Sequence, residues 1–363
     1  MPSFITVRLL LTVIVAGAVL AFGLLLLTVA IRLLRYVVDR RRAAAEKQVR
    51  PAMLEAIAGE GVDASLVAAA GAHGRAVERL AFGYLARVRG DGHDLLAGLL
   101  QQRGTAGRVL RASRHPGPNR RANAASRLGL IASAEAGQRL DQMATGDHSA
   151  RVRIVAARGL GKTGTGHAAS TLLSLLGPDG KVPEGVVASA LLELGPEAVP
   201  ALRAEVRPGR DAHRRALAAD LLGLLDVMPA WEDLVGCLAE NDLGLRLNAA
   251  RALGRLGVPQ AAAALSHCLA AGQNLELRAV AARSLGLIGS QDSTGPLAAC
   301  LDDPDYWVAH NAAAALAALG QGGQQVLVRV AAGHGAGSLH AREALYGVRL
   351  TEGEPLPVVG VGR

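Results

Sequence analysis

The chain has 363 residues, half of them hydrophobic and only 2% aromatic, with a formal net charge of +8. This composition favours alanine- and leucine-rich helices over a sheet protein. The positive charge is local: residues 32–50 carry +5, residues 103–127 hold seven arginines and no acid, and residues 128–363 are net −3. A basic surface over the bulk of the chain is therefore excluded.

The first element is an uncharged apolar run of 23 residues, Leu9 to Ile31. A helix of this length rises roughly 34 Å, enough to span a bilayer core. A secretory signal peptide has an apolar region of about 7–15 residues followed by a small-residue cleavage site, whereas arginines follow Ile31. We therefore predict a transmembrane anchor over residues 1–35.

Basic residues flank this span unequally, with Arg8 before it and seven lysines and arginines between residues 32 and 50. By the positive-inside rule, the bulk of the protein faces the cytoplasm. We predict a single-pass protein of a bacterial cytoplasmic (inner) membrane, with residues 36–50 as a basic juxtamembrane segment. The same segment is also suited to anionic lipid head groups, at about 1 kcal/mol per basic residue.

Residues 51–118 show helical patterns without a strict period. The patterned segments are Ala52–Ala58, Arg75–Arg89, Asp94–Gln102 and Gly107–Ser113. Because a solenoid needs an atypical first unit to cover its open end, we expect a helical cap or degenerate repeats here. The stretch Arg114–Asn119 predicts a break before the regular array.

A repeat dominates residues 119–350. Segments such as LNAARALGRLG (Leu247 to Gly257) recur, and they end 31 or 32 residues apart, at residues 132, 164, 195, 226, 257, 289 and 320. Each contains a leucine of one column: Leu128, Leu160, Leu191, Leu222, Leu253, Leu285 and Leu316. Seven or eight residues past each end stands a leucine of a second column: Leu140, Leu172, Leu202, Leu234, Leu265, Leu297 and Leu327. This period predicts stacked helical hairpins, an all-α solenoid.

The array ends with a predicted helix over Gln321–Gly333 and a shortened closing helix over His340–Val348. Residues 351–363 hold two prolines and three glycines and are predicted to be a flexible tail.

The repeats resemble a known family. A turn such as Asp302–Asp305, then Trp307-Val308, an alanine pair, leucine and glycine, is similar to the HEAT repeat of the short type first noted in phycobilisome lyases. The resemblance covers roughly residues 120 to 350. It implies the α-solenoid fold, and it implies a binding surface more than any one activity.

A glycine-rich segment, Gly159-Leu-Gly-Lys-Thr-Gly164, matches the spacing of a nucleotide-binding loop. A dinucleotide loop needs a preceding strand and a following helix, but these glycines end a repeat helix. We therefore interpret them as structural. No nucleophile, base and acid form a catalytic set, so we predict neither catalytic residues nor a cofactor.

The cysteines Cys237, Cys268 and Cys300 share one core column of adjacent repeats. Neighbouring helices pack about 8–10 Å apart, too far for a disulfide, so we expect buried free thiols. None of the ten histidines belongs to a spaced ligand set. The sequence therefore predicts no metal site.

Arginine recurs at the start of one helix in most repeats, and Glu184 and Ala309 occupy this position in the other two. Two interpretations stay open: pairs with turn aspartates such as Asp147 and Asp242, as is common in proteins that this repeat resembles, or a basic groove for an acidic partner. The candidate partner-binding residues are Arg103, Arg108, Arg111, Arg114, Arg120, Arg121, Arg127, Arg153, Arg215, Arg246 and Arg278.

These features together predict a non-enzymatic scaffold at the membrane that binds a partner protein through the face of the arginine-bearing helices. A membrane-bound enzyme such as a glycosyltransferase is a partner suggested by the resemblance alone. One alternative is an enzyme or chaperone like the phycobilisome lyases, although the membrane span and the few aromatic residues disfavour it. The other is a nucleic-acid-binding solenoid, which the negative charge of the array disfavours.

Overall fold

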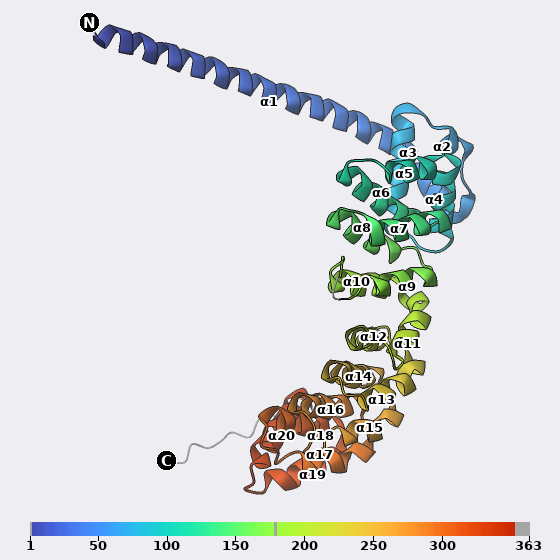
Figure 1. Cartoon of the computed structure of the whole chain (residues 1–363), viewed down its shortest axis with the longest axis vertical. Helices are drawn as coiled ribbons and strands as arrows, with labels where there is room; N and C mark the ends of the chain where they lie inside the picture. The colour runs from blue at the N-terminus through green and yellow to red at the C-terminus, as the bar shows by residue number, and fades with distance from the viewer. Residues whose placement is uncertain (1, 178–179, 353–363) are drawn as a thin grey trace. The chain divides into compact units, whose positions relative to one another are not determined.

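The computed structural model describes residues 2–177 and 180–352, and all regular structure in that range is helical (Figure 1). This confirms the all-α prediction. The chain divides into two compact units, Met1–Ala112 and Ser113–Arg363.

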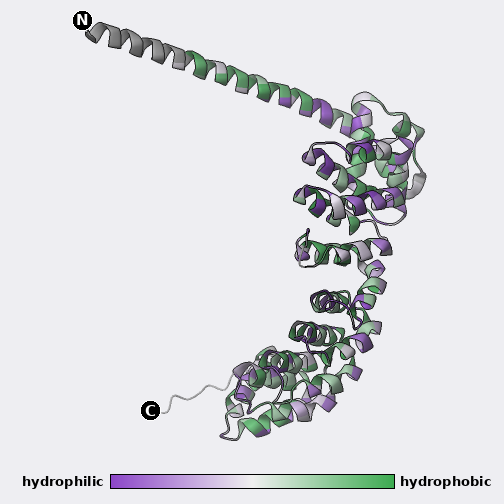
Figure 2. Cartoon of the chain, in the orientation of Figure 1, coloured by the Kyte–Doolittle hydropathy of each residue, from purple (hydrophilic) through white to green (hydrophobic). Residues whose placement is uncertain are grey.

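The first unit begins with a single helix of 54 residues, α1 (Pro2–Glu55). It continues without a break past residues 35 and 50, where the predicted segments end. Figure 2 shows α1 as hydrophobic over its described middle part and hydrophilic toward its carboxyl end. After a π-helical turn (Ala56–Glu60) follow α2 (Ala64–Ala68), α3 (Gly71–Leu85), α4 (Asp91–Gln102) and α5 (Thr105–Ala112).

The carboxyl end of α1 packs within this unit. Met53 is fully buried, and Arg79 of α3 donates to Glu46 of α1 at 2.8 Å. Arg103 donates to the carbonyl oxygens of Val67 and Ala69, both at 2.8 Å, and so satisfies acceptors at the end of α2. These contacts support a small helical domain around the end of α1.

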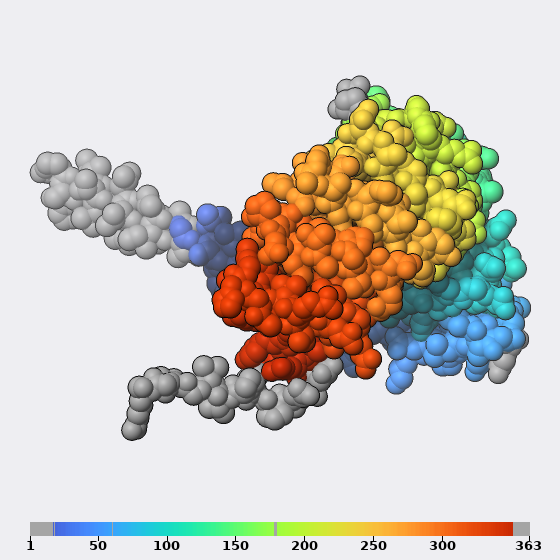
Figure 3. All heavy atoms as spheres, turned by 90° about the horizontal axis from the view of Figure 1, so that it is seen from below, coloured from blue at the N-terminus to red at the C-terminus, as the bar shows by residue number. Residues whose placement is uncertain are grey.

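The second unit is a two-layer stack (Figure 1). The inner, concave layer consists of α6 (Pro118–Ile131), α8 (Ala150–Leu160), α10 (Glu184–Leu194), α12 (Ala212–Leu224), α14 (Leu243–Leu256), α16 (Leu275–Ile288), α18 (Tyr306–Ala318) and α20 (Gly337–Glu352). The outer layer consists of α7 (Ala134–Gly146), α9 (Gly166–Ser174), α11 (Val199–Val206), α13 (Trp231–Leu238), α15 (Ala262–His267), α17 (Thr294–Ala299) and α19 (Gln321–Ala331). Viewed along the stack, the last repeats form one continuous surface (Figure 3).

Both predicted leucine columns form the core of this stack. Every leucine of the two columns is at most 1% exposed. One column lies on the inner helices and the other on the outer helices. The two helices of each hairpin therefore bury their apolar sides against each other and against the neighbouring hairpins. The solenoid prediction is confirmed.

The predicted repeat ends reverse the chain with a positive φ. Gly257, for example, has a φ of 64° and donates its N–H to the carbonyl oxygen of Leu253. All seven ends have positive φ, including two that are not glycine, Ala132 and Asp226, each at 54°. Glycine adopts this conformation most readily, which explains why glycine recurs at the repeat ends. The repeat period in the sequence is therefore the spacing of the chain reversals.

Glycines also bring the inner helices close together. A Cβ on Gly254 would lie 2.7 Å from the Cβ of Ser284 on the next inner helix, and one on Gly286 would lie 2.8 Å from the Cα of Ala315. The same close approach joins Gly129 to Gly159, Gly161 to Ala190 and Gly223 to Ala252. We call these five glycines, Gly129, Gly161, Gly223, Gly254 and Gly286, the glycine seam.

The second unit begins six residues before the predicted start at residue 119. Arg139 donates to both the hydroxyl and the carbonyl oxygen of Ser113, the first residue of this unit, and so ties this turn to α7. At the other end α20 extends to Glu352 and is longer than the predicted closing helix. Residues 353–363 of the predicted tail lie outside the described residues.

Candidate partner-binding groove

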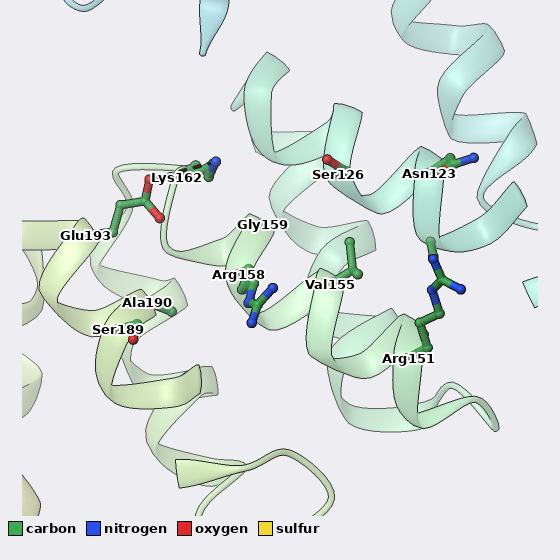
Figure 4. Close-up of a pocket in the computed structure, with 11 residues that line it drawn as sticks. Asn123, Ser126, Arg151, Val155, Arg158, Gly159, Lys162, Ser189, Ala190 and Glu193 are labelled. Atoms are coloured by element: carbon green, nitrogen blue, oxygen red, sulfur yellow. Dashed lines mark ion pairs between the residues drawn. The ribbon is translucent and has the colours of Figure 1, made fainter. Parts of the chain in front are cut away.

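A groove of about 490 Å³ lies on the inner layer, across α6, α8 and α10 (Figure 4). Its polar lining comes from Asn123, Ser126, Arg151, Arg158, Lys162, Ser189 and Glu193. Val155, Ala122 and Ala190 supply apolar wall between these groups. Polar groups set among apolar wall are a common arrangement in recognition sites.

The spacing of the helices around this groove is set by the glycine seam. A side chain on Gly161 would meet the carbonyl oxygen of Ala190 at 2.6 Å, and one on Gly129 would meet the Cα of Gly159 at 2.6 Å. Gly164 ends the turn with a φ of 63°. The glycine-rich segment therefore serves helix packing and chain reversal, in agreement with its structural interpretation, and it follows helix α8 rather than a strand.

The charges of the groove are unbalanced. The lining holds three basic side chains, Arg151, Arg158 and Lys162, and one acidic side chain, Glu193. The Lys162 ammonium lies 3.9 Å from the Glu193 carboxylate, and both side chains are more than a third exposed. Such a loose exposed pair holds little free energy and is readily rearranged by a ligand. The groove therefore has an excess of positive charge and accessible donors.

The predicted arginine column lies elsewhere, at the ends of the inner helices, where each guanidinium contacts the turns. Arg121 donates to both carboxylate oxygens of Asp147 at 2.8 and 2.9 Å. Arg215 donates to the carbonyl oxygen of Val206 at 3.0 Å and to Glu240 at 2.8 Å. We call Arg121, Arg153, Arg215, Arg246 and Arg278 the arginine ladder.

The remaining members of the ladder follow the same pattern. Arg278 donates to the carbonyl oxygen of Leu269 at 3.0 Å and to Asp303. Arg246 donates to Leu238 at 3.0 Å and to Gln273 at 2.6 Å, while Arg153 donates to backbone carbonyl oxygens. Turn pairing, one of the two interpretations left open, is thus realised at Asp147. Asp242, however, caps α14 through the N–H of Leu245 instead of pairing with Arg215.

The other predicted contact residues divide into two groups. Arg103 and Arg108 make contacts inside the first unit, Arg108 with Glu78 and with the hydroxyl of Thr105 at 2.8 Å. Arg111, Arg114, Arg120 and Arg127 have exposed side chains. A partner-binding role for any of these arginines stays a prediction, and the ladder residues are the least available for it.

The ladder gives a pH-dependent contribution to stability. Hydrogen bonds from Arg121 lower the pKa of Asp147 below its usual value, so this carboxylate stabilises the fold above about pH 4 and loses that contribution as the pH falls through its folded pKa. We expect Asp147→Asn to lower the free energy of unfolding at pH 7 and to have no effect below the folded pKa. Urea unfolding at a series of pH values tests this, and a deficit independent of pH would contradict it.

The three cysteines are buried free thiols, as predicted. Burial raises the pKa of the Cys237 thiol to about 11 and raises the pKa values of Cys268 and Cys300. Burial therefore disfavours the thiolate, which is the nucleophilic form, at all three positions.

Two sets of side chains in the structure were not predicted from the sequence. The groove cations Arg151 and Arg158 lie outside the arginine ladder. Arg158 recurs as Arg251 and Arg283, each two residues before a leucine of the inner column, and its spacing of seven residues from Arg151 places both on one face of α8. The second set is His310, His340 and Glu343, which bring three metal-ligand atoms within 4.8 Å of one another. Its two histidines lie 30 residues apart, so no short ligand motif marks them.

Comparison with known proteins agrees with this architecture. A model of HEAT repeats matches residues 269–345, and a model of the PBS lyase HEAT-like repeat matches residues 245–271. No curated protein sequence matches the chain.

Several solved structures match parts of the chain. Kap121p is 12% identical over 73% of this chain and 34% of its own length, with a TM-score of 0.48. Human deoxyhypusine hydroxylase is 19% identical over 76% of this chain and 97% of its own, with a TM-score of 0.31. The complex of CpcE and CpcF of phycocyanin lyase from Nostoc is 21% identical over 67% of this chain and 94% of that one, with a TM-score of 0.28. Residues 245–345 of this α-solenoid thus match HEAT repeats, including one PBS lyase HEAT-like repeat.

Proposed function

We propose that this protein is a membrane-anchored, non-enzymatic scaffold whose concave groove binds an acidic segment of a partner protein at the cytoplasmic face of the membrane. The observation that carries this proposal is the excess of cations over acids in the groove on α6, α8 and α10. The ladder arginines are satisfied by turn groups within the protein, whereas Arg158 is exposed and its charge is available to a ligand.

Exposed apolar side chains on α1 support the anchor. Leu20, Phe22 and Leu24 are 66%, 61% and 54% exposed, and such a continuous apolar surface on one helix is unfavourable in water. Two stretches of the described residues are long and apolar enough to cross a membrane, Val19–Gly59 and Glu184–Val206. The second is part of the solenoid, because Gly195 reverses the chain between α10 and α11. The first is therefore the candidate span.

Charge complementarity favours an acidic protein segment as the ligand. The groove of about 490 Å³ accommodates a few side chains, and concave solenoid surfaces are suited to extended segments. A nucleic acid would need a basic face over several phosphates, yet residues 128–363 are net −3. The anchor would raise the local concentration of a bound partner at the membrane.

A charge-reversal experiment tests the groove. The full chain in detergent is titrated against a fluorescein-labelled peptide rich in glutamate, with Arg151→Glu/Arg158→Glu as the variant. We expect binding that weakens with salt, and at least about a tenfold loss of affinity in the variant, because two attractive charges become repulsive. Arg207→Glu/Arg210→Glu is the matched control, since both side chains are exposed in the turn before α12 and lie outside this groove.

Two results would contradict the proposal. One is an equal loss of affinity in both double variants, which would indicate attraction by net charge alone. The other is tighter binding of an RNA oligonucleotide of the same charge than of the peptide, with the same dependence on Arg151 and Arg158.

A further inference from the structure

Two histidines and a glutamate meet where α18 contacts α20. His310 lies on α18, and His340 and Glu343 lie on α20. The spacing of three residues places His340 and Glu343 on the same face of that helix. One ligand-type atom from each of the three side chains lies within 4.8 Å of the other two.

The separation of these atoms suits a metal ion. Zn²⁺ binds histidine nitrogen and carboxylate oxygen at about 2.0–2.2 Å, so tetrahedral ligand atoms are about 3.4 Å apart. Nδ1 of His310 and Oε2 of Glu343 are 3.6 Å apart. That distance is long for a hydrogen bond but close to the edge of such a tetrahedron.

A second observation points to a missing partner. Nδ1 of His340 is inaccessible to solvent and has no hydrogen-bond partner among the described residues. Buried polar atoms are nearly always satisfied, so an unpartnered nitrogen on a ring that also offers a ligand atom to this cluster supports a group that binds there.

Aromatic rings hold both imidazoles in place. The Tyr306 ring stacks on His310 with its centroid 5.5 Å away and meets His340 edge-on at 5.2 Å. Trp307 approaches His310 edge-on at 6.1 Å. These ring contacts restrict the orientations of both imidazoles.

The nearest cation on the same helix does not oppose a bound ion. Arg342 lies between His340 and Glu343 in sequence, but its Nε donates to the carbonyl oxygen of Ala331 at 3.0 Å and its Nη2 to that of Gly333 at 3.4 Å. Its guanidinium is thus held at the end of α19.

We propose that His310, His340 and Glu343 bind a divalent transition-metal ion, with Zn²⁺ as the best match to two imidazoles and one carboxylate. Three protein ligands leave a fourth position for water or for a side chain of a partner. The ion also links α18 to α20, and so fastens the last helix of the solenoid to the repeat before it.

Zinc binding to the full chain tests the proposal. The protein is purified in detergent without a histidine tag, stripped with a chelator and titrated with Zn²⁺ by calorimetry, while Co²⁺ absorption reports the coordination. We expect one ion per chain, and a loss of affinity of at least about tenfold in Glu343→Gln and in His310→Ala, each of which lacks one ligand. Zn²⁺ should raise the melting temperature of the unmodified chain and not that of the variants.

His213→Ala is the matched control. His213 forms an exposed pair with Glu184 at 2.7 Å but has no third ligand nearby among the described groups, so this variant should bind Zn²⁺ as the unmodified chain does. The Glu343 side chain is 58% exposed, so Glu343→Gln should fold, as its melting temperature in chelator would show. The absence of stoichiometric binding, or equal binding in Glu343→Gln and His310→Ala, would overturn the proposal.

Discussion

Replacing Leu20, Leu24 and Leu27 with lysine is expected to move the protein from the membrane fraction to the soluble fraction. Each of these leucines has more than half of its surface exposed on α1. A leucine near the centre of a span favours insertion by a few tenths of a kcal/mol, whereas a lysine opposes it by about 2.5–3.5 kcal/mol. Three exchanges therefore outweigh the contribution of the remaining apolar residues.

Fractionation of cells followed by a carbonate wash measures this effect. The variant with isoleucine at the same three positions is the control, and it should stay in the membrane. Intact-mass measurement of the membrane-bound protein separates an anchor from a cleaved leader, because cleavage would remove the residues of the span. A carbonate-resistant lysine variant would contradict the anchor.

Gly254→Ala is expected to destabilise the solenoid by about 1–3 kcal/mol, the usual effect of overpacking a tight contact. The added methyl group would lie 2.7 Å from both the Cβ and the Oγ of Ser284, and 2.9 Å from its Cα. Helices α14 and α16 would have to separate along the glycine seam to accommodate it.

The control substitution is expected to change the free energy of unfolding in the opposite direction. Gly236 lies in the outer helix α13, and a methyl group added there would have no atom within 4 Å. Gly236→Ala should therefore stabilise the protein by about 0.5–1 kcal/mol through helix propensity. Urea unfolding of both variants and of the unmodified protein measures these changes in the free energy of unfolding. Destabilisation of equal size at both positions, or none at Gly254, would show that the seam is not a close contact.

Most of the solenoid is predictable because each repeat obeys the same packing rule. The leucine columns had to face inward for any helical hairpin of this period, and the repeat ends had to reverse the chain. Even Ala132 and Asp226, which lack the freedom of glycine, adopt the predicted reversal with a φ of 54°. Tertiary packing here overrides the local cost of a left-handed conformation.

The groove and the contacts of single side chains were less predictable, because they depend on which residues of different repeats meet. Arg215 pairs with Glu240 and not with Asp242, two residues further along the same turn. Arg103 belongs to an acid-free stretch that predicts a basic surface, yet it satisfies carbonyl oxygens at the end of α2. The repeat period predicts the structural position of a residue within its repeat, but it does not predict which group its side chain contacts.

The most direct test of the proposed scaffold is site-specific photocrosslinking in intact membranes. A photoreactive residue replaces Ser126 or Ser189 in the groove, or Gln325 on the outer helix α19 as a control. We predict a discrete crosslinked protein from both groove positions that is absent from the control and is lost when Arg151 and Arg158 become glutamate. Crosslinks of equal yield from Gln325, or crosslinks from the groove that survive the charge reversal, would contradict binding of an acidic partner in the groove.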